Sequence, residues 1–200
     1  MTSRRVRLDG ERSRELILDA AAKLATVEGL DGLSLGRLAE VTGISKSGVF
    51  GLFGSKEDLQ LSTIRKARQV FITEVVGPAL DAQPGRDQLH ALCSGYLDHV
   101  ERRVFPGGCF FASVASEVSS RPGPVRDRVA DEQKQWTSLL VENAKRATQA
   151  GELPPHTAPP ERLALELSTM LTGADIAYLL HEDPAILEGV RDTIRARLGL

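Results

Sequence analysis

Residues 45–48, Ser-Lys-Ser-Gly, place two hydroxyl groups, one cation and a bare stretch of backbone next to one another. Proteins use hydroxyl, ammonium and backbone N–H groups to bind phosphate oxygens and the polar edges of bases. The apolar residues Ile44, Val49 and Phe53 flank this segment, as expected of a helix anchored on one side. An irregular surface loop would not explain these apolar anchors.

Two glycines in the same segment, Gly48 and Gly51, oppose helix formation. Each destabilises a helix by about 1 kcal/mol relative to alanine. Close approach of the backbone to DNA would offset that cost, whereas a purely structural helix would gain nothing. An irregular surface loop also accommodates glycine, so the residues by themselves leave both interpretations open.

The elements expected to position this segment are two helices joined by a turn. Ser34 can cap a helix over 35–42, and a second, short helix covers 46–52. Gly43 and Ile44 form a turn of the length and glycine content that a helix-turn-helix requires. In that motif the first residues of the second helix meet base edges in the major groove.

Apolar residues recur at spacings of three and four along the rest of the chain, the period of amphipathic helices. Proline and glycine mark the breaks between them. The sequence predicts an all-α fold of nine helices, over residues 11–28, 35–42, 46–52, 55–76, 86–105, 109–120, 124–150, 161–182 and 184–200.

The composition, with 42% hydrophobic and 26% charged residues, is that of an ordinary globular protein. The stretch from Met1 to Arg14 is polar throughout, unlike a signal peptide. The apolar segment 163–180 is interrupted by polar residues, so we interpret it as a buried helix rather than a membrane span. The two cysteines imply no disulfide framework. A cytoplasmic protein without membrane contact is expected.

Charge is distributed unevenly. The net charge of −2 argues against a protein that coats nucleic acid by bulk electrostatics. Residues 1–75 nevertheless hold twelve Lys or Arg against ten Asp or Glu, and the remainder holds thirteen against seventeen. This asymmetry leaves room for a local nucleic-acid contact near the N-terminus.

The run from Leu33 to Leu59, LSLGRLAEVTGISKSGVFGLFGSKEDL, resembles the DNA-binding domain of the tetracycline-repressor (TetR/AcrR) family. The segment Ile17–Ala21 and the Phe53-x-x-Lys56 pattern match as well. The resemblance implies a nine-helix TetR-like architecture. It implies a DNA-binding domain over 1–58 and a ligand-binding and dimerisation domain over 59–200.

Carried over by position, the resemblance implies a set of DNA contacts. Ser34, Thr42 and Lys56 are expected to contact phosphate. Lys46, Ser47 and Gly48 are expected to face bases. The expected DNA-binding residues are Ser34, Thr42, Ser45, Lys46, Ser47, Gly48, Phe50 and Lys56.

Two positions depart from the family pattern. Phe50 stands where the family usually has tyrosine, and Leu52 where histidine or tyrosine is frequent. Neither side chain here can donate to phosphate. Contact with a thymine methyl or a sugar and packing in the core are equal alternatives for Phe50. The arginines at 4, 5 and 7 form either a DNA-binding arm or a solubilising tail.

For the second half of the chain, the resemblance implies an inducer pocket within residues 86–150 and a dimer interface formed by the last two helices. The apolar stretch from Met170 to Leu180 supports the interface independently, because a helix that is apolar all round needs burial on several sides. The candidate pocket residues are Tyr96, His99, Phe105, Cys109, Phe110, Trp136, Met170 and Tyr178. Most of them serve equally well as ordinary core.

Cys109 follows two glycines and is expected in the first turn of helix 109–120, where the helix dipole can activate a thiol. Some regulators that resemble this chain sense oxidants or electrophiles through a cysteine near this point. A small buried hydrophobic residue is the alternative.

An enzyme is the main competing class. Histidines at 90, 99, 156 and 181 lack metal-ligand spacing, and the sequence holds no phosphate-binding glycine loop or nucleophile elbow. Neither catalysis nor a metal or cofactor is therefore expected. A helical interaction module is a second alternative, but it leaves the chemistry of residues 45–56 unexplained.

The sequence is best interpreted as a homodimeric regulator that binds double-stranded operator DNA. The expected mode of action is repression from a palindromic operator, with release by a small, largely apolar inducer. Activation of transcription stays open as the alternative.

Overall fold

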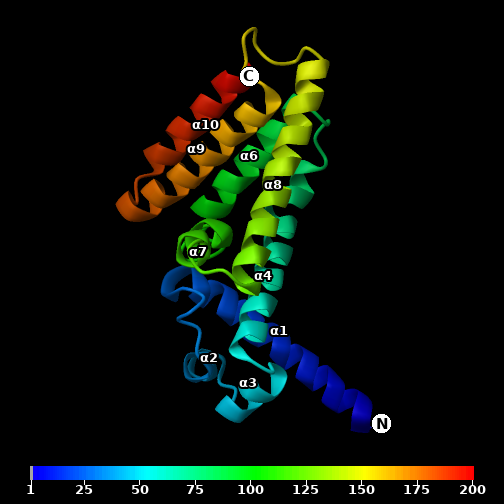
Figure 1. Ribbon diagram of the computed structural model, residues 1–200, viewed down its shortest axis with the longest axis vertical. Coiled ribbons are helices and arrows are strands. Elements are labelled where there is room, and N and C mark those ends of the chain that lie inside the picture. The colour runs from blue at the N-terminus through cyan, green and yellow to red at the C-terminus, as the bar shows by residue number, and fades with distance from the viewer. Residues whose placement is uncertain (1) are drawn as a thin grey trace. The chain divides into compact units, whose positions relative to one another are not determined.

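The computed structural model describes the backbone of residues 2–200 and the side chains of residues 10–200. Every regular element within this part is a helix (Figure 1), which confirms the predicted all-α class. The predicted number of helices, nine, is also found there if the continuous run from Lys56 to Ala79 is counted once.

The first two helices begin and end where local chemistry dictates. Helix α1 (Thr2–Glu28) begins earlier than predicted and is followed by Gly29, which adopts φ +80°, a backbone conformation suited to glycine. Helix α2 (Leu35–Thr42) is capped by the Ser34 hydroxyl, which accepts a hydrogen bond from the N–H of Arg37. The Ser34 cap is therefore confirmed.

The next two helices also start at serine caps. In α3 (Lys46–Leu52) the Ser45 hydroxyl accepts from the N–H of Gly48 at 3.1 Å. Before α4 (Lys56–Phe71) the Ser55 hydroxyl accepts from the N–H of Asp58 at 3.0 Å. Each cap satisfies an N–H group that the helix leaves without an internal partner.

The prediction that Gly77-Pro78 breaks the long helix was wrong. The helix widens instead into a π-helical turn, η1 (Ile72–Val76), and continues as the short α5 (Gly77–Ala79). The N–H of Gly77 bonds to the carbonyl of Ile72, five residues back. Because proline cannot donate, the altered bonding pattern just before Pro78 lets the helical path continue past it.

The remaining helices lie close to the predicted ranges: α6 (Arg86–Glu101), α7 (Phe110–Val118), α8 (Pro124–Gln149), α9 (Pro160–His181) and α10 (Pro184–Leu198). Asp183 caps α10 by accepting from the N–H of Ala185 at 2.9 Å. Helix α6 ends earlier than predicted, because Arg103 adopts φ 49° and starts a series of turns before α7.

By packing, the chain forms two compact units, each made of two segments. One contains residues 1–69 and 105–129, and the other contains residues 70–104 and 130–200. In the first unit α1 packs against α2, α3 and α7; in the second, α6, α9 and α10 pack side by side (Figure 1). The division expected near residue 58 concerns function and stays a prediction.

Helix α9 is long and apolar enough to cross a membrane by length and composition alone. In the structure it packs against α6 and α10, and one face is buried. That face includes the carboxylate residue Asp175, which is 1% exposed. Since core helices pass the same test of length and apolarity, this packing supports the interpretation as a core helix.

Candidate nucleic-acid interface

The helices α2 and α3 are anchored by buried apolar side chains and turn their polar residues outward. Of the predicted apolar anchors, Val49 and Phe53 are almost fully buried, whereas Ile44 is half-buried; Leu38 of α2 is fully buried beside them. The exposed residues of this surface are Ser34, Ser45, Lys46, Ser47, Phe50 and Lys56, while Thr42 and Gly48 are half-buried. All eight predicted DNA-binding residues therefore lie at least partly on the surface of one compact unit.

The start of α3 presents a small hydroxyl cluster. The Ser45 and Ser47 oxygens lie 3.2 Å apart, and Ser45 also caps the helix through Gly48. Both serines are exposed, so their hydroxyl groups can also reach a molecule placed against α3. The geometry suits hydrogen bonding to an acceptor-rich partner.

The side chain of Lys46 reaches back to the first turn of α2. A Cβ atom added at Gly36 would lie 3.6 Å from the Lys46 ammonium nitrogen, so glycine leaves space for this lysine. Ser34, the cap of α2, lies on the same side, 4.0 Å from that Cβ position. A cation beside a helix N-terminus favours a bound anion.

Two residues predicted to contact phosphate already make hydrogen bonds within the chain. The Thr42 hydroxyl donates to the carbonyl of Leu38 at 2.6 Å. The Lys56 ammonium donates to the carbonyl of Asp31 at 2.7 Å. A contact of Thr42 with phosphate requires its hydroxyl to rotate, whereas Lys56 keeps two further protons for a second acceptor.

The two glycines of α3 have different surroundings. A Cβ atom at Gly48 would lie 3.0 Å from the Ile44 side chain and 3.2 Å from the Ser45 oxygen, so packing inside the motif favours glycine there. A Cβ atom at Gly51 would meet nothing within 4 Å. Open space at Gly51 is consistent with a surface that a ligand approaches closely.

Phe50 is 62% exposed, which excludes the core-packing alternative for this side chain. Leu52, at the second position that departs from the family pattern, is half-buried. An exposed aromatic ring between two glycines presents an apolar surface without a donor group. It suits contact with a methyl group or a sugar better than contact with phosphate.

Arg14, which the sequence places only at the end of the polar N-terminal stretch, supports the motif from inside. Its guanidinium donates to the carbonyl of Leu52 and to the hydroxyl of Ser62, both at 2.9 Å. No local pattern identifies this role, because the partners lie 38 and 48 residues away. The side chains of the arginines at 4, 5 and 7 lie outside the described residues.

The predicted pocket residues belong to both compact units. Tyr96, His99 and Trp136 belong to an aromatic cluster around Phe71, whose ring centroid lies 5.2 Å from that of Trp136. The candidates Phe105, Cys109 and Phe110 belong to the other compact unit, and Tyr178 lies beside Arg103. Burial lowers the pKa of His99 to about 4, so its imidazole is neutral near pH 7.

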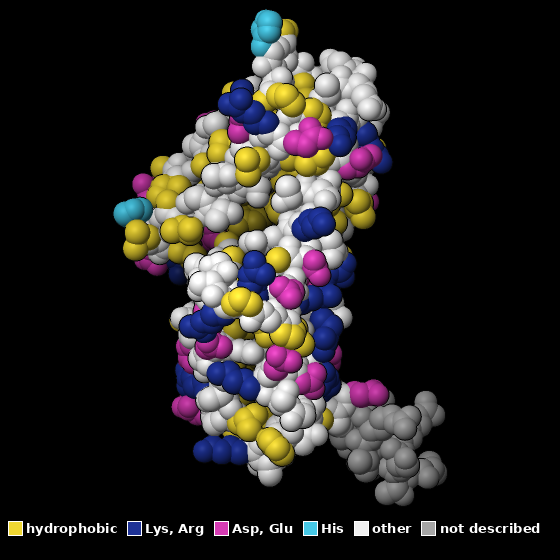
Figure 2. All heavy atoms as spheres, in the orientation of Figure 1, with side chains coloured by type: hydrophobic (Ala, Val, Ile, Leu, Met, Phe, Trp, Pro, Cys, Tyr) yellow, Lys and Arg dark blue, Asp and Glu magenta, His cyan; other side chains and the backbone are white. Residues whose placement is uncertain are grey.

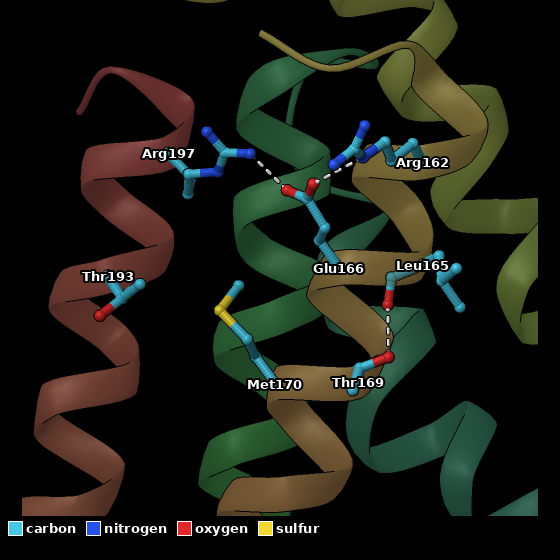
Figure 3. Close-up of a pocket in the computed structure, with 7 residues that line it drawn as sticks. All are labelled: Arg162, Leu165, Glu166, Thr169, Met170, Thr193 and Arg197. Carbon is cyan, nitrogen blue, oxygen red and sulfur yellow. Dashed lines mark hydrogen bonds and ion pairs between the residues drawn. The ribbon is translucent and has the colours of Figure 1, made fainter.

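Met170 lines a groove of about 530 Å³ on α9 and α10. Figure 3 shows the Glu166 carboxylate between the guanidinium groups of Arg162 and Arg197, with Met170 pointing toward α10. The groove is lined by Arg162, Leu165, Glu166, Thr169, Met170, Thr193 and Arg197. Of the predicted pocket residues it contains Met170 alone.

The two cysteines are buried and not joined by a disulfide. Burial raises the pKa of the Cys93 thiol to about 12, so that thiol is unreactive at neutral pH. Cys109 occupies the N-cap position of α7 and is 3% exposed. Among the described side chains, no group of three His, Cys, Asp or Glu is placed to hold a metal ion.

Comparison with known families covers both halves of the chain. The family model described as "Bacterial regulatory proteins, tetR family" matches residues 17–62. The model described as "Tetracyclin repressor-like, C-terminal domain" matches residues 85–194, more than half of the chain. The HTH-type transcriptional regulator LmrA of Bacillus subtilis is 22% identical over 145 residues, which cover 66% of this chain and 71% of that protein.

Solved structures share the fold over almost the whole chain. A TetR transcriptional regulator from Chloroflexus aurantiacus is 24% identical, with a TM-score of 0.85 and coverage of 94% of both chains. The regulator AibR, solved with isovaleryl coenzyme A and operator DNA, is 19% identical, with a TM-score of 0.74. The match covers 93% of this chain and 98% of AibR.

Proposed function

The chain belongs to the TetR family of bacterial DNA-binding transcriptional regulators, and from this premise we propose that it is a homodimeric repressor of a palindromic operator. A small, largely apolar inducer releases it from that operator. The observation that most directly supports this proposal is the surface of α2 and α3, where the predicted DNA-binding residues lie exposed or half-exposed above a buried apolar anchor.

Chemistry supports DNA as the partner of this surface. Ser34, Ser45 and Ser47 offer hydroxyl groups, and Lys46 and Lys56 offer cations. In this proposal Ser34 and Lys56 bind phosphate, whereas Lys46, Ser47 and Gly48 face bases. Phe50 takes an apolar contact with a thymine methyl or a sugar instead of a phosphate contact.

The exposed face of α9 supports dimerisation through α9 and α10. Leu165, Ile176 and Leu180 are 62%, 59% and 73% exposed, and they follow one side of the helix. Gly173 lies on the same side, with open space around it, which permits a partner helix to approach closely. Hydrophobic side chains are visible over this helix pair in Figure 2. A second copy would cover this stripe and the adjacent groove.

A small-molecule inducer is supported by the fold and by the aromatic cluster around Phe71. AibR, which shares the fold, was solved with isovaleryl coenzyme A and with operator DNA. In this chain the rings of Tyr96 and Trp136 stack at 6.1 Å, and His99 is neutral at physiological pH. Such surroundings favour a neutral, apolar ligand over a charged one.

DNA binding is tested with duplexes that the protein selects from a random library. The affinity is expected to fall steeply with salt, because lysines displace counterions from phosphates. Lys56→Ala should weaken all duplexes similarly and reduce the salt slope by about one. Lys46→Ala should change the preferred sequence.

Lys134→Ala, which removes an exposed lysine of α8 in the other compact unit, is the matched control and should leave both quantities unchanged. A flat salt response, or no selected sequence, contradicts the proposal. A changed preference from Lys56→Ala together with uniform weakening from Lys46→Ala would reverse the two roles.

A further inference from the structure

The carboxylate of Glu117, in the last turns of α7, binds the turn between α1 and α2. Its two oxygens accept hydrogen bonds from adjacent backbone N–H groups, at 2.8 Å from Leu30 and 2.7 Å from Asp31. Both partners belong to the same compact unit as Glu117. A carboxylate that accepts two N–H bonds is a strong, oriented contact, because the acceptor is charged.

Glycine at position 29 makes this contact possible. A Cβ atom there would lie 2.8 Å from one oxygen of Glu117, and the backbone of Gly29 has φ +80°. At the other end of the segment, a Cβ atom at Gly107 would lie 1.9 Å from the carbonyl of Thr26, and the Gly107 N–H bonds to the Thr26 hydroxyl. The end of α1 is therefore held at two points by residues 105–129.

The same turn is bound from α4. Lys56 donates to the carbonyl of Asp31, and Gln60 donates to the carbonyl of Leu30 and to the Asp31 carboxylate, both at 3.1 Å. Arg121, just beyond α7, forms an ion pair with the Asp31 carboxylate. Asp31 thus joins α7 to the lysine expected to bind phosphate.

We propose that Glu117 is a positioning residue for DNA binding, an inference that rests on the proposed function. By fixing Leu30 and Asp31, it orders the short turn that ends at Ser34, the cap of α2, and it orders the carbonyl that holds Lys56. Without Glu117 the turn gains freedom, which must be lost again when Ser34 and Lys56 engage phosphates.

The sign of the effect separates this role from simple electrostatics. A carboxylate near a DNA-binding surface repels phosphate, so its removal would strengthen binding if charge alone mattered. The positioning role predicts the opposite. Glu117→Ala should weaken binding to the selected duplex by about tenfold, and Glu117→Gln, which keeps one acceptor oxygen, by less.

The measurement is the dissociation constant at a temperature where circular dichroism shows both proteins fully folded. A residue that only stabilises the fold would leave this constant unchanged. Asp127→Asn, which removes an exposed negative charge from the same compact unit, is the control and should change affinity less than twofold. Equal or tighter binding by Glu117→Ala overturns the inference, whereas failure of the wild-type protein to bind any duplex overturns the proposed function instead.

A double-mutant cycle tests the contact itself. Gly29→Ala should weaken DNA binding in the wild-type protein partly by displacing the Glu117 carboxylate, and it should cost less affinity in the Glu117→Ala background. Backbone strain at position 29 is common to both backgrounds and cancels. Additive effects would contradict the inference.

Hydrogen exchange tests the contact between Glu117 and the turn without relying on DNA affinity. The N–H groups of Leu30 and Asp31 should be protected in the wild-type protein and should lose that protection in Glu117→Ala, whereas the N–H groups of α1 keep theirs. Rapid exchange at both positions in the wild-type protein would equally overturn the inference.

Discussion

The guanidinium group of Arg14 lies over the ring of Phe53, with 4.6 Å between its Cζ atom and the ring centroid. Arg14 belongs to α1, and Phe53 is the C-cap residue of α3. The same guanidinium donates to the carbonyl of Leu52, the last residue of α3. Helix α1 thus holds the end of the helix expected to enter the major groove.

Arg14→Lys should lower the free energy of unfolding by about 1–2 kcal/mol, because an ammonium group cannot stack on Phe53 while donating to both Leu52 and Ser62. DNA affinity should fall as well, since the end of α3 becomes mobile. Urea denaturation and DNA titration measure the two effects. Arg12→Lys, which makes the same change at an exposed position of the same helix, is the control. Equal effects from both substitutions would contradict the role assigned to Arg14.

Phe50→Tyr should strengthen DNA binding several-fold, because it restores a hydroxyl group that can donate to phosphate. The salt slope should stay the same, since no charge is added. Replacing thymine by uracil in the selected duplex should weaken DNA binding by the wild-type protein, because the methyl group that Phe50 contacts is removed. Binding by Phe50→Ala should not change, because that variant has no ring to contact the methyl group. Equal sensitivity of both proteins to uracil would exclude a methyl contact.

Ile176→Lys or Leu180→Lys should convert the dimer to monomer, because a charge would be buried against the apolar face of a second copy. Sedimentation velocity measures the oligomeric state, and DNA affinity should fall in parallel because one half-site is lost. Leu80→Lys, at a position that is 59% exposed outside α9 and α10, should leave the dimer intact. A dimer that survives both α9 substitutions places the interface elsewhere.

The buried imidazole of His99 predicts a pH dependence of stability. Burial lowers its pKa to about 4 in the folded protein, against 6.5 for the ordinary side chain. The unfolded state therefore binds a proton first as the pH falls. The contribution of the neutral His99 to the free energy of unfolding is complete above about pH 6.5. It is lost as the pH falls from about 6.5 to 4, and it amounts to at most about 3 kcal/mol.

Urea denaturation of the wild-type protein and of His99→Gln across this pH range checks the assignment. The two proteins should differ in the slope of stability against pH within the window and run parallel above it. Parallel curves throughout would show that His99 does not titrate differently on folding.

Helix ends were predictable from the sequence because their chemistry is local. The caps at Ser34, Ser45 and Asp183 each need one hydroxyl or carboxylate a few residues from its donor. Val49 and Phe53 were likewise identified as buried anchors, although Ile44, predicted with them, is half-buried. These interactions depend on neighbouring residues, so a single sequence contains enough information to predict them.

Contacts between distant residues were not predictable in this way. Glu117 lies 87 residues from Leu30, and neither residue type indicates that the two are in contact. The engagement of Lys56 with Asp31 was missed for the same reason. The candidate pocket residues were chosen by aromatic character, which does not distinguish core packing from a ligand site, and the structure divides them between two units.

The π-helical turn at Ile72–Val76 lets the helix that contains it carry one extra residue. A π-turn holds one residue more than an α-turn, so the helix on either side keeps its orientation around the axis. Deleting the exposed Thr73 would therefore convert this turn to an α-turn without rotating the residues beyond it. The buried positions Phe71, Val75 and Ala79 would still share a face, now at spacings of three and four, so the turn tolerates a change of chain length that a regular helix would not.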